Sequence, residues 1–421
     1  MNIGRFIKVL GPGLLYAGAA IGVSHLVQST RAGAGFGFDL IWILILVNIM
    51  KYPFFEFAPR YATSTGGSLI DGYKKLGMWA VIAFALLTLA TMFTIQAAVT
   101  IVTAGLVANI FHLSIGMVPL SAIILGSTVV ILIVGRFSIL DKLIKVVIII
   151  LATSTIIAVV YAFGNGYNPQ PGQAHHFDWL NRIDILFLIA FIGWMPAPID
   201  VAVWSSLWTV EKSKSLSFKP DLRESLVDFR IGYIGTAFLA LCFLLLGALV
   251  MHDSGEELSA NGTEFAGQLI SMYTVNIGQW SRPIIAIAAL MTMFSTTLTV
   301  IDAYPRVLQP ITTTLIPKWK PGKREHGMIY WMWIVIVTAG ALILLRYFAT
   351  SMRLMVDVAT TLSFITAPVL AFMNYRVITS KHVPEDARPG FWLRLWAWAG
   401  IIFLGIFTLF YIGWRLEVIV I

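Results

Sequence analysis

Residues 11–33 read GPGLLYAGAAIGVSHLVQSTRAG, and this stretch decides the fold. It is apolar enough to enter a bilayer, but Gly22-Val23-Ser24-His25 interrupts its centre. An imidazole at mid-membrane is costly to bury unless it has a function. A second apolar stretch is interrupted in a similar way by Trp194-Met195-Pro196-Ala197-Pro198. Two broken apolar helices in corresponding halves of one chain are the pattern of a transporter binding site.

The composition predicts an all-α polytopic membrane protein. Of the 421 residues, 58% are hydrophobic and 12% are charged, whereas soluble domains carry roughly 25% charged residues. The net charge of +8 comes from basic residues in alternate loops, which is a sign of membrane topology and not of nucleic-acid binding. Phosphate-binding loops and clustered Cys/His motifs are missing, so we expect no enzyme and no cofactor. We also expect no cleavable signal peptide, because the first apolar segment carries the break.

Apolar runs of about 20 residues recur along the chain, and each run of this length can span a bilayer as a helix. We predict about eleven spans. Their expected limits are 11–33, 37–63, 78–108, 115–135, 139–163, 183–209, 227–251, 282–306, 327–346, 354–377 and 391–414.

The loops between the spans alternate between basic and less basic. The basic segments lie near Lys74-Lys75, Arg136 to Lys145, Lys212 to Arg223, Lys318 to Arg324, and Arg376 to Arg394. Because basic loops stay in the cytoplasm, we expect a cytoplasmic N-terminus and an external C-terminus. The predicted location is the inner (plasma) membrane of a bacterial-type cell.

The number of spans also predicts an internal repeat. Spans one to five and six to ten form two halves, and an odd number of spans in each half gives the halves opposite orientations. We therefore expect one transport domain over residues 1–421, with a first half over 1–163, an inverted second half over 183–377 and an extra helix over 391–414. The broken spans head the two halves, as in inverted-repeat transporters.

The sequence resembles the first two helices of the Nramp family of proton-coupled divalent-metal transporters. The resemblance rests on GPGLLYAGAAIG, on Arg31-Ala32-Gly33 and on Gly35-Phe36-Gly37-Phe38-Asp39-Leu40-Ile41-Trp42. Met195-Pro196 falls where the family has a Met-Pro-His motif, and Ser295-Thr296-Thr297 and the approach to span five also fit. The resemblance covers spans one to ten and implies a LeuT-type fold with alternating access.

The chain departs from the family at its functional motifs. The family's Asp-Pro-Gly-Asn aligns with Gly22 to His25, so glycine stands at the metal-binding carboxylate and histidine at the metal-binding amide. The methionine is kept as Met195, but Ala197 replaces the histidine that follows the proline. The helix-three acids align with the Gln96-Ala97 region and Thr100. The resemblance therefore predicts a divergent, Nramp-related branch.

The expected substrate site lies at the two breaks. Pro196 and Pro198 lack an N–H group, so carbonyl oxygens upstream lose their helical partners and can face a ligand. We predict that the substrate contacts Gly22, Ser24, His25, Met195, Ala197 and Asp200. Imidazole nitrogen, thioether sulfur and carboxylate oxygen are metal ligands, so His25, Met195 and Asp200 are the candidates to hold a metal ion. Ordinary packing and structural hydrogen bonding are the alternatives for each.

Three charged residues, Lys51, Glu56 and Arg60, lie in the second half of span two. Glu56 and Arg60 have the i, i+4 spacing of a helical ion pair, and we expect this pair to be structural. Lys51 has two interpretations: its ammonium extends to the membrane surface, or it supplies a fixed positive charge inside the protein.

Further coupling or gating candidates lie in spans eight and ten. Ser295, Thr296 and Thr299 are candidates to line a coupling-ion site beside span one, with helix packing as the alternative. Asp302 is expected to meet a base of span two, and Asp357 is a candidate gate.

We expect a secondary-active transporter, monomeric in the lipid bilayer, whose leading substrate is a divalent cation such as Mn, Fe or Mg. His25 or Asp200 would carry any coupled proton. Two alternatives remain open. One is a carrier of a small organic solute, with Gly22 making room for it. The other is a non-transporting sensor on the same fold. Flux measurements separate the sensor from both transporters.

Overall fold

The computed structural model describes residues 8–135, 137–164, 175–252, 258–316, 323–348 and 350–416. Within 137–145 and 323–326 only the backbone is described. The side chains of the basic segment Arg136 to Lys145, and most of Lys318 to Arg324, therefore lie outside the described residues.

The described chain is built from helices. In chain order they are α2 (Pro12–Ala20), the π-helix η1 (Ser24–Ser29), α3 (Thr30–Phe36), α4 (Ile41–Thr65), α5 (Leu69–Leu76), α6 (Met78–Ile110), α7 (Met117–Val134), α8 (Phe137–Gly164), α9 (Arg182–Trp194), α10 (Val201–Ser215), α11 (Leu222–Val250), α12 (Gly262–Ile277), the 3₁₀-helix η2 (Gln279–Ser281), α13 (Arg282–Leu315), α14 (Lys323–Phe348), α15 (Met352–Ile378), η3 (Glu385–Ala387) and α16 (Phe391–Arg415).

The predicted membrane spans are present. Nine helices in the described part of the chain are long and apolar enough to cross a membrane, namely α4, α6, α7, α8, α11, α13, α14, α15 and α16. The other two predicted spans are the broken ones. The first consists of α2, η1 and α3, and the sixth consists of α9 and α10. Each piece is shorter than the roughly 20 residues that a span requires, so only the two broken helices as wholes match bilayer thickness.

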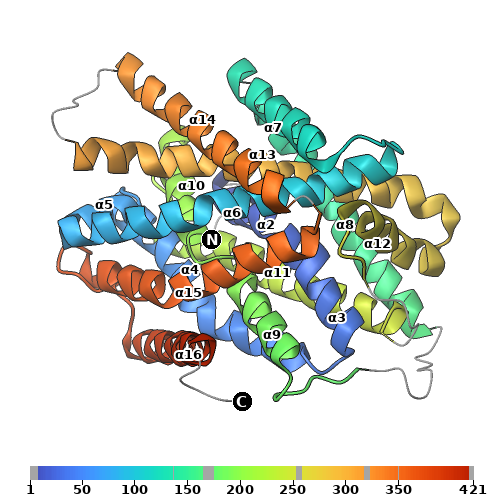
Figure 1. Ribbon diagram of the computed structural model, residues 1–421. Helices are drawn as coiled ribbons and strands as arrows, with labels where there is room; N and C mark the ends of the chain where they lie inside the picture. Colours follow the sequence, from blue (N-terminus) through green and yellow to red (C-terminus); the bar gives the residue numbers. More distant parts are fainter. Residues whose placement is uncertain are drawn as a thin grey trace.

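The two broken helices lie side by side in the interior of the helix bundle (Figure 1). α11 packs along all three pieces of the first broken helix, whereas α15 packs against α9 and α4 packs against α10. The broken helices also touch each other, since η1 contacts α9 and α2 contacts α10. This packing brings together two breaks that lie far apart in the sequence, one near its start and one near its middle.

The breaks have different local causes. In the first helix, α2 ends at Ala20 and the chain resumes as the π-helix at Ser24, with Leu26 N–H bonded to Gly22 O at 2.9 Å. Ser24 and His25 therefore begin the second half of this helix, and the unwound stretch is shorter than predicted. In the sixth helix, Pro196 and Pro198 remove two N–H donors, and this prevents the helix from continuing.

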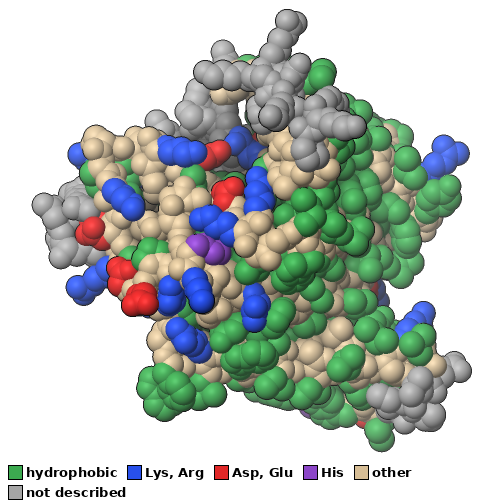
Figure 2. Space-filling model, turned by 90° about the vertical axis from the view of Figure 1, so that its left-hand side faces the viewer, with side chains coloured by type: hydrophobic (Ala, Val, Ile, Leu, Met, Phe, Trp, Pro, Cys, Tyr) green, Lys and Arg blue, Asp and Glu red, His purple; other side chains and the backbone are tan. Residues whose placement is uncertain are grey.

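The molecular surface is divided between polar ends and apolar flanks. Figure 2 shows Lys and Arg side chains gathered on the end of the molecule where α5 lies, while hydrophobic side chains cover the adjoining flank. Large exposed apolar residues such as Trp42, Leu86 and Ile149 lie on span helices. A lipid environment explains why these residues are exposed, since water would not favour them.

Candidate functional site

The first break packs tightly against α13. A Cβ atom added at Gly22 would lie 2.8 Å from Thr296 Oγ1 and 2.9 Å from Thr296 Cγ2. Both distances are below normal van der Waals contact, so a side chain at this position requires Thr296 to move. In this conformation the space that a carboxylate at position 22 would need is filled by α13.

His25 is fully buried and uses both ring nitrogens. Its Nε2 lies 2.9 Å from Thr236 O on α11, and its Nδ1 lies 2.8 Å from Ser24 Oγ. The Ser24 hydroxyl also donates to Ala20 O at 2.5 Å. Because a carbonyl only accepts, Nε2 carries a proton.

The Ser24 hydroxyl has one proton for two neighbours. When it donates to Ala20 O, the contact with His25 Nδ1 is a hydrogen bond only if Nδ1 is also protonated. When the ring is neutral, the same hydroxyl can turn and donate to Nδ1. His25 therefore keeps the same two neighbours, Thr236 O and Ser24 Oγ, whichever way the hydroxyl turns.

The sixth helix leaves carbonyl oxygens free where α9 ends. In an α-helix the oxygen of residue 192 would accept from the N–H of residue 196, but that residue is proline. The Lys51 ammonium on α4 takes this place and donates to Ile192 O at 2.6 Å and to Gly193 O at 2.9 Å. Lys51 is fully buried, so the interpretation that it extends to the membrane surface is wrong.

Asp200 is a buried carboxylate just ahead of the second half of this helix. Its Oδ2 accepts a hydrogen bond of 3.1 Å from Tyr304 of α13. Its Oδ1 is buried and makes no hydrogen bond within the described part of the molecule. Lys51 and Asp200, a base and an acid, interact electrostatically and flank the break. A buried charge with a free oxygen is a natural ligand for a cation.

The two breaks meet at Met195. Ser29 of η1 donates to Met195 Sδ at 3.6 Å. Ala197, which follows the first proline, is buried. The hydrogen-bond partners of His25 lie on the first broken helix and α11, whereas that of Asp200 lies on α13. The prediction that His25, Met195 and Asp200 share one metal site is therefore not tested by these contacts. Among the described residues there is no group of three or more His, Cys, Asp or Glu side chains placed to hold a metal.

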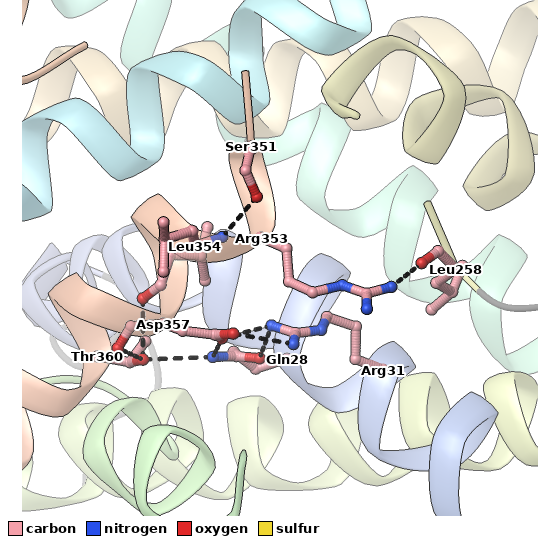
Figure 3. A network of polar contacts seen from close by, with 9 residues as sticks. Gln28, Arg31, Leu258, Ser351, Arg353, Leu354, Asp357 and Thr360 are labelled. Carbon is pink, nitrogen blue, oxygen red and sulfur yellow. Dashed lines mark hydrogen bonds and ion pairs between the residues drawn. The ribbon is translucent and has the colours of Figure 1, made fainter. Parts of the chain in front are cut away.

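A polar network links the second half of the first helix to span ten (Figure 3). Arg31 forms a bidentate pair with Asp357 on α15, at 2.6 Å to Oδ1 and 3.1 Å to Oδ2. Gln28 accepts from Arg31 at 3.0 Å and donates to Thr360 at 3.4 Å. The Arg31 side chain is 10% exposed and that of Asp357 is 32% exposed. Asp357 is among the residues predicted from the sequence, whereas Arg31 is not, although Arg31 is a lone charge six residues after His25 in an apolar helix.

The remaining charged candidates form structural clusters. Glu56 pairs with Arg60 at 2.5 Å, as predicted, and also receives hydrogen bonds from Tyr52 and Arg230. Asp302 pairs with Arg306 at 2.6 Å and accepts from Tyr330 at 2.5 Å. The prediction that Asp302 meets a base of span two is wrong, because Arg306 lies one turn away on the same helix.

Hydroxyl groups line the contact between α6 and α13. Thr103 lies 2.8 Å from Thr297, and Gln96 donates to Thr100 at 3.1 Å. Ser295 and Thr296 are buried on α13, and Thr299 is half-buried there. Thr296 bonds to Thr292 O at 3.1 Å. Helix packing accounts for these contacts, and a coupling-ion role for Ser295, Thr296 and Thr299 stays a prediction.

A comparison with known protein families shows to which family the chain belongs. Residues 13–412 match the family model for natural resistance-associated macrophage protein-like (Nramp) proteins. The chain belongs to the Nramp family. An uncharacterized protein of Pasteurella multocida is 36% identical over 413 residues, which cover 96% of this chain and 93% of the relative. The divalent metal cation transporter MntH of Aeromonas hydrophila is 22% identical over 328 residues, covering 74% of this chain and 76% of that transporter. This Nramp protein is therefore a divergent member.

Solved structures show the same fold. A mutant of the manganese transporter of Eremococcus coleocola matches with a TM-score of 0.71 at 12% identity, covering 97% of this chain and 87% of the transporter. Mhp1, a nucleobase-cation-symport-1 family transporter solved with bromovinylhydantoin bound, matches with a TM-score of 0.58 at 13% identity and covers 97% and 93%. This Nramp protein is an all-helical membrane transporter with a LeuT-type inverted repeat, and it is not an enzyme.

Proposed function

We propose that this Nramp protein is a secondary-active transporter that carries a divalent metal cation, such as Mn, Fe or Mg, by alternating access. The observation that carries the proposal is the buried Asp200 carboxylate beside the break of the sixth helix, whose Oδ1 accepts no hydrogen bond from any described residue. The names of a distant relative, MntH, and of a structural neighbour, the manganese transporter, support the same class of substrate.

In this proposal the ion exchanges part of its water shell for ligands at the sixth helix. Asp200 provides charge, and the Met195 thioether favours Mn or Fe over Mg because it is a soft ligand. Ser29 contacts the Met195 sulfur, and Ala197 is buried two residues further along the chain. His25 acts as the proton-coupling group and not as a metal ligand, because both ring nitrogens are already bonded.

The Arg31–Asp357 pair is proposed as a gate. It joins α3, which packs against α11, to α15, which packs against α9. Opening one side of the site requires these helices to separate, and the bidentate pair must then break. Forming the pair again closes the route after the ion has entered.

The topology and assembly remain part of the proposal. The basic end of the molecule in Figure 2 supports the assignment of that end to the cytoplasm. We propose a monomer in a bacterial inner membrane, with a cytoplasmic N-terminus and an external C-terminus. We also propose the division into a first half over residues 1–163, an inverted second half over 183–377 and an extra helix over 391–414. It rests on the five spans of each half and on the broken helix that heads each half.

The test is uptake of radioactive manganese by proteoliposomes that contain the purified protein. We expect saturable uptake above that of empty liposomes, and at least a roughly tenfold loss for Asp200→Asn, because the amide carries no charge. Tyr304→Phe is the matched control, since it removes only the hydrogen bond to Oδ2. Absence of manganese, iron and magnesium uptake would refute the metal proposal.

A small organic solute is the second candidate, and one observation favours it. The described residues hold no group of three or more His, Cys, Asp or Glu side chains placed to hold a metal ion. Mhp1, which shares this fold, was solved with an organic ligand bound. Proteoliposomes that exchange an organic solute but no divalent ion would support this candidate. A protein that moves neither would be a sensor.

A further inference from the structure

Lys51 provides a positive charge in the interior of the molecule. Its side chain is fully buried, and its ammonium donates to Ile192 O and Gly193 O at the end of α9. These two oxygens lie immediately before the break, where unwound carbonyls of broken membrane helices coordinate cations. An ammonium on a four-carbon chain thus occupies the position that a free cation would take.

The absence of helical donors explains why these oxygens accept from a lysine. If α9 continued, the oxygen of Ile192 would accept from residue 196, but this residue is proline and has no N–H. The chain between Met195 and Asp200 is not helical. Two buried carbonyls without partners would each carry a desolvation cost. Lys51 removes that cost for both oxygens and holds the end of α9 to α4.

The two ionisable side chains next to the break, Lys51 and Asp200, carry opposite charges when both are ionised. Asp200 is the acid that interacts with Lys51. The other acids on the adjoining elements have their own partners: Glu56 of α4 binds Arg60, Asp184 of α9 binds His175, and Asp357 of α15 binds Arg31. A cation that approaches Asp200 therefore meets one negative charge and one positive charge.

We propose that Lys51 is a tethered cation that determines substrate selectivity by setting the charge of the site at the sixth helix. It lowers the affinity for every free cation, and it lowers the affinity for a divalent ion more than for a monovalent ion. This inference rests on the proposed function. It makes Lys51 a specificity-determining residue, in addition to its support of the broken helix.

An electrostatic role of Lys51 differs from a structural role in how its effect depends on the charge of the bound ion. Coulomb energy is proportional to the charge of the ion. When the ammonium is replaced by a neutral group, the logarithm of the gain in affinity should be twice as large for a divalent ion as for a monovalent one. Loosening of the helix alone would not produce that ratio.

The experiment measures the dissociation constants of manganese and sodium ions for the purified full-length protein by calorimetric titration. Lys51→Gln keeps a hydrogen-bond donor without charge, Lys51→Met is a second neutral variant, and Lys51→Arg is the control that keeps the charge. Thermal denaturation identifies the variants that fold. We expect about 100-fold tighter manganese binding and about tenfold tighter sodium binding in the neutral variants, and little change in Lys51→Arg.

The outcomes distinguish the two proposals. If the wild type binds manganese and a folded neutral variant binds it no more tightly, Lys51 does not set the site charge and this inference fails, while the proposed function stands. Equal gains for manganese and sodium would also overturn it. If neither the wild type nor any variant binds a divalent ion, the proposed function itself fails.

Discussion

The breaks of the first and sixth helices lie in contact, but different interactions hold them. The first is surrounded by uncharged groups: Thr236 O, the Ser24 hydroxyl and the Thr296 side chain. The sixth is flanked by the charges of Lys51 and Asp200. A break filled by neighbouring side chains favours tight packing, whereas a break flanked by an acid and a base favours binding an ion. The two breaks thus differ in chemistry although they lie in contact.

The largest expected effect is on packing at the sixth helix. A Cβ atom at Gly193 would lie 2.1 Å from Thr360 O, a backbone atom that cannot rotate away. Gly193→Ala should therefore separate α9 from α15 and cost about 3 kcal/mol or more of stability. Thermal denaturation in detergent measures the loss. A stable variant would show that α9 and α15 are not held as closely as described.

The proposed gate, the Arg31–Asp357 pair, joins α3 of the first broken helix to α15, which packs against the sixth. Breaking this pair should have the next largest effect. Asp357→Asn keeps the shape of the side chain but removes the charge that Arg31 meets, and it should cost about 1.5 to 3 kcal/mol, the usual contribution of a hydrogen bond to a charged group. Both the thermal midpoint and the manganese uptake of proteoliposomes should fall. Thr360→Ala is a control at the edge of the same network, and it should change uptake less. Unchanged uptake in Asp357→Asn would show that the Arg31–Asp357 pair is not a gate.

A milder effect is expected at the first break. Gly22→Ala places its methyl group against the side chain of Thr296 and not against backbone, so Thr296 can adjust. We expect a loss of about 1 to 2 kcal/mol. Thr296→Ala in the same chain should restore most of that loss, measured by the same denaturation. Failure of this rescue would mean that something other than Thr296 limits the space beside Gly22.

The smallest effect on stability is expected at His25. Gln can bond to Thr236 O and Ser24, so His25→Gln should change stability by less than about 1 kcal/mol. Because the amide does not titrate, the variant should lose the part of the pH dependence of uptake that a proton on His25 provides. A pH profile identical to that of the wild type would place proton coupling at another residue.

The sequence predicts those features that depend on local chemistry. The breaks, the spans and the Glu56–Arg60 pair follow from proline positions, apolar runs and helical spacing, and the structure contains all three. The partners of buried polar groups are different, because they lie on helices far away in the chain. Lys51 reaches α9, 141 residues on, and His25 reaches α11, 211 residues on. Asp302 was assigned to a distant base, although Arg306 was available on its own helix.

The comparison of the two breaks is tested most directly by calorimetric titration of manganese into the wild type, Asp200→Asn and His25→Gln. We predict that Asp200→Asn weakens binding by at least about 100-fold, because the negative charge that attracts the ion is lost. His25→Gln should stay within about threefold of the wild type at neutral pH, since its ring nitrogens already have partners. Loss of binding in His25→Gln with full binding in Asp200→Asn would contradict the account and move the metal to the first helix.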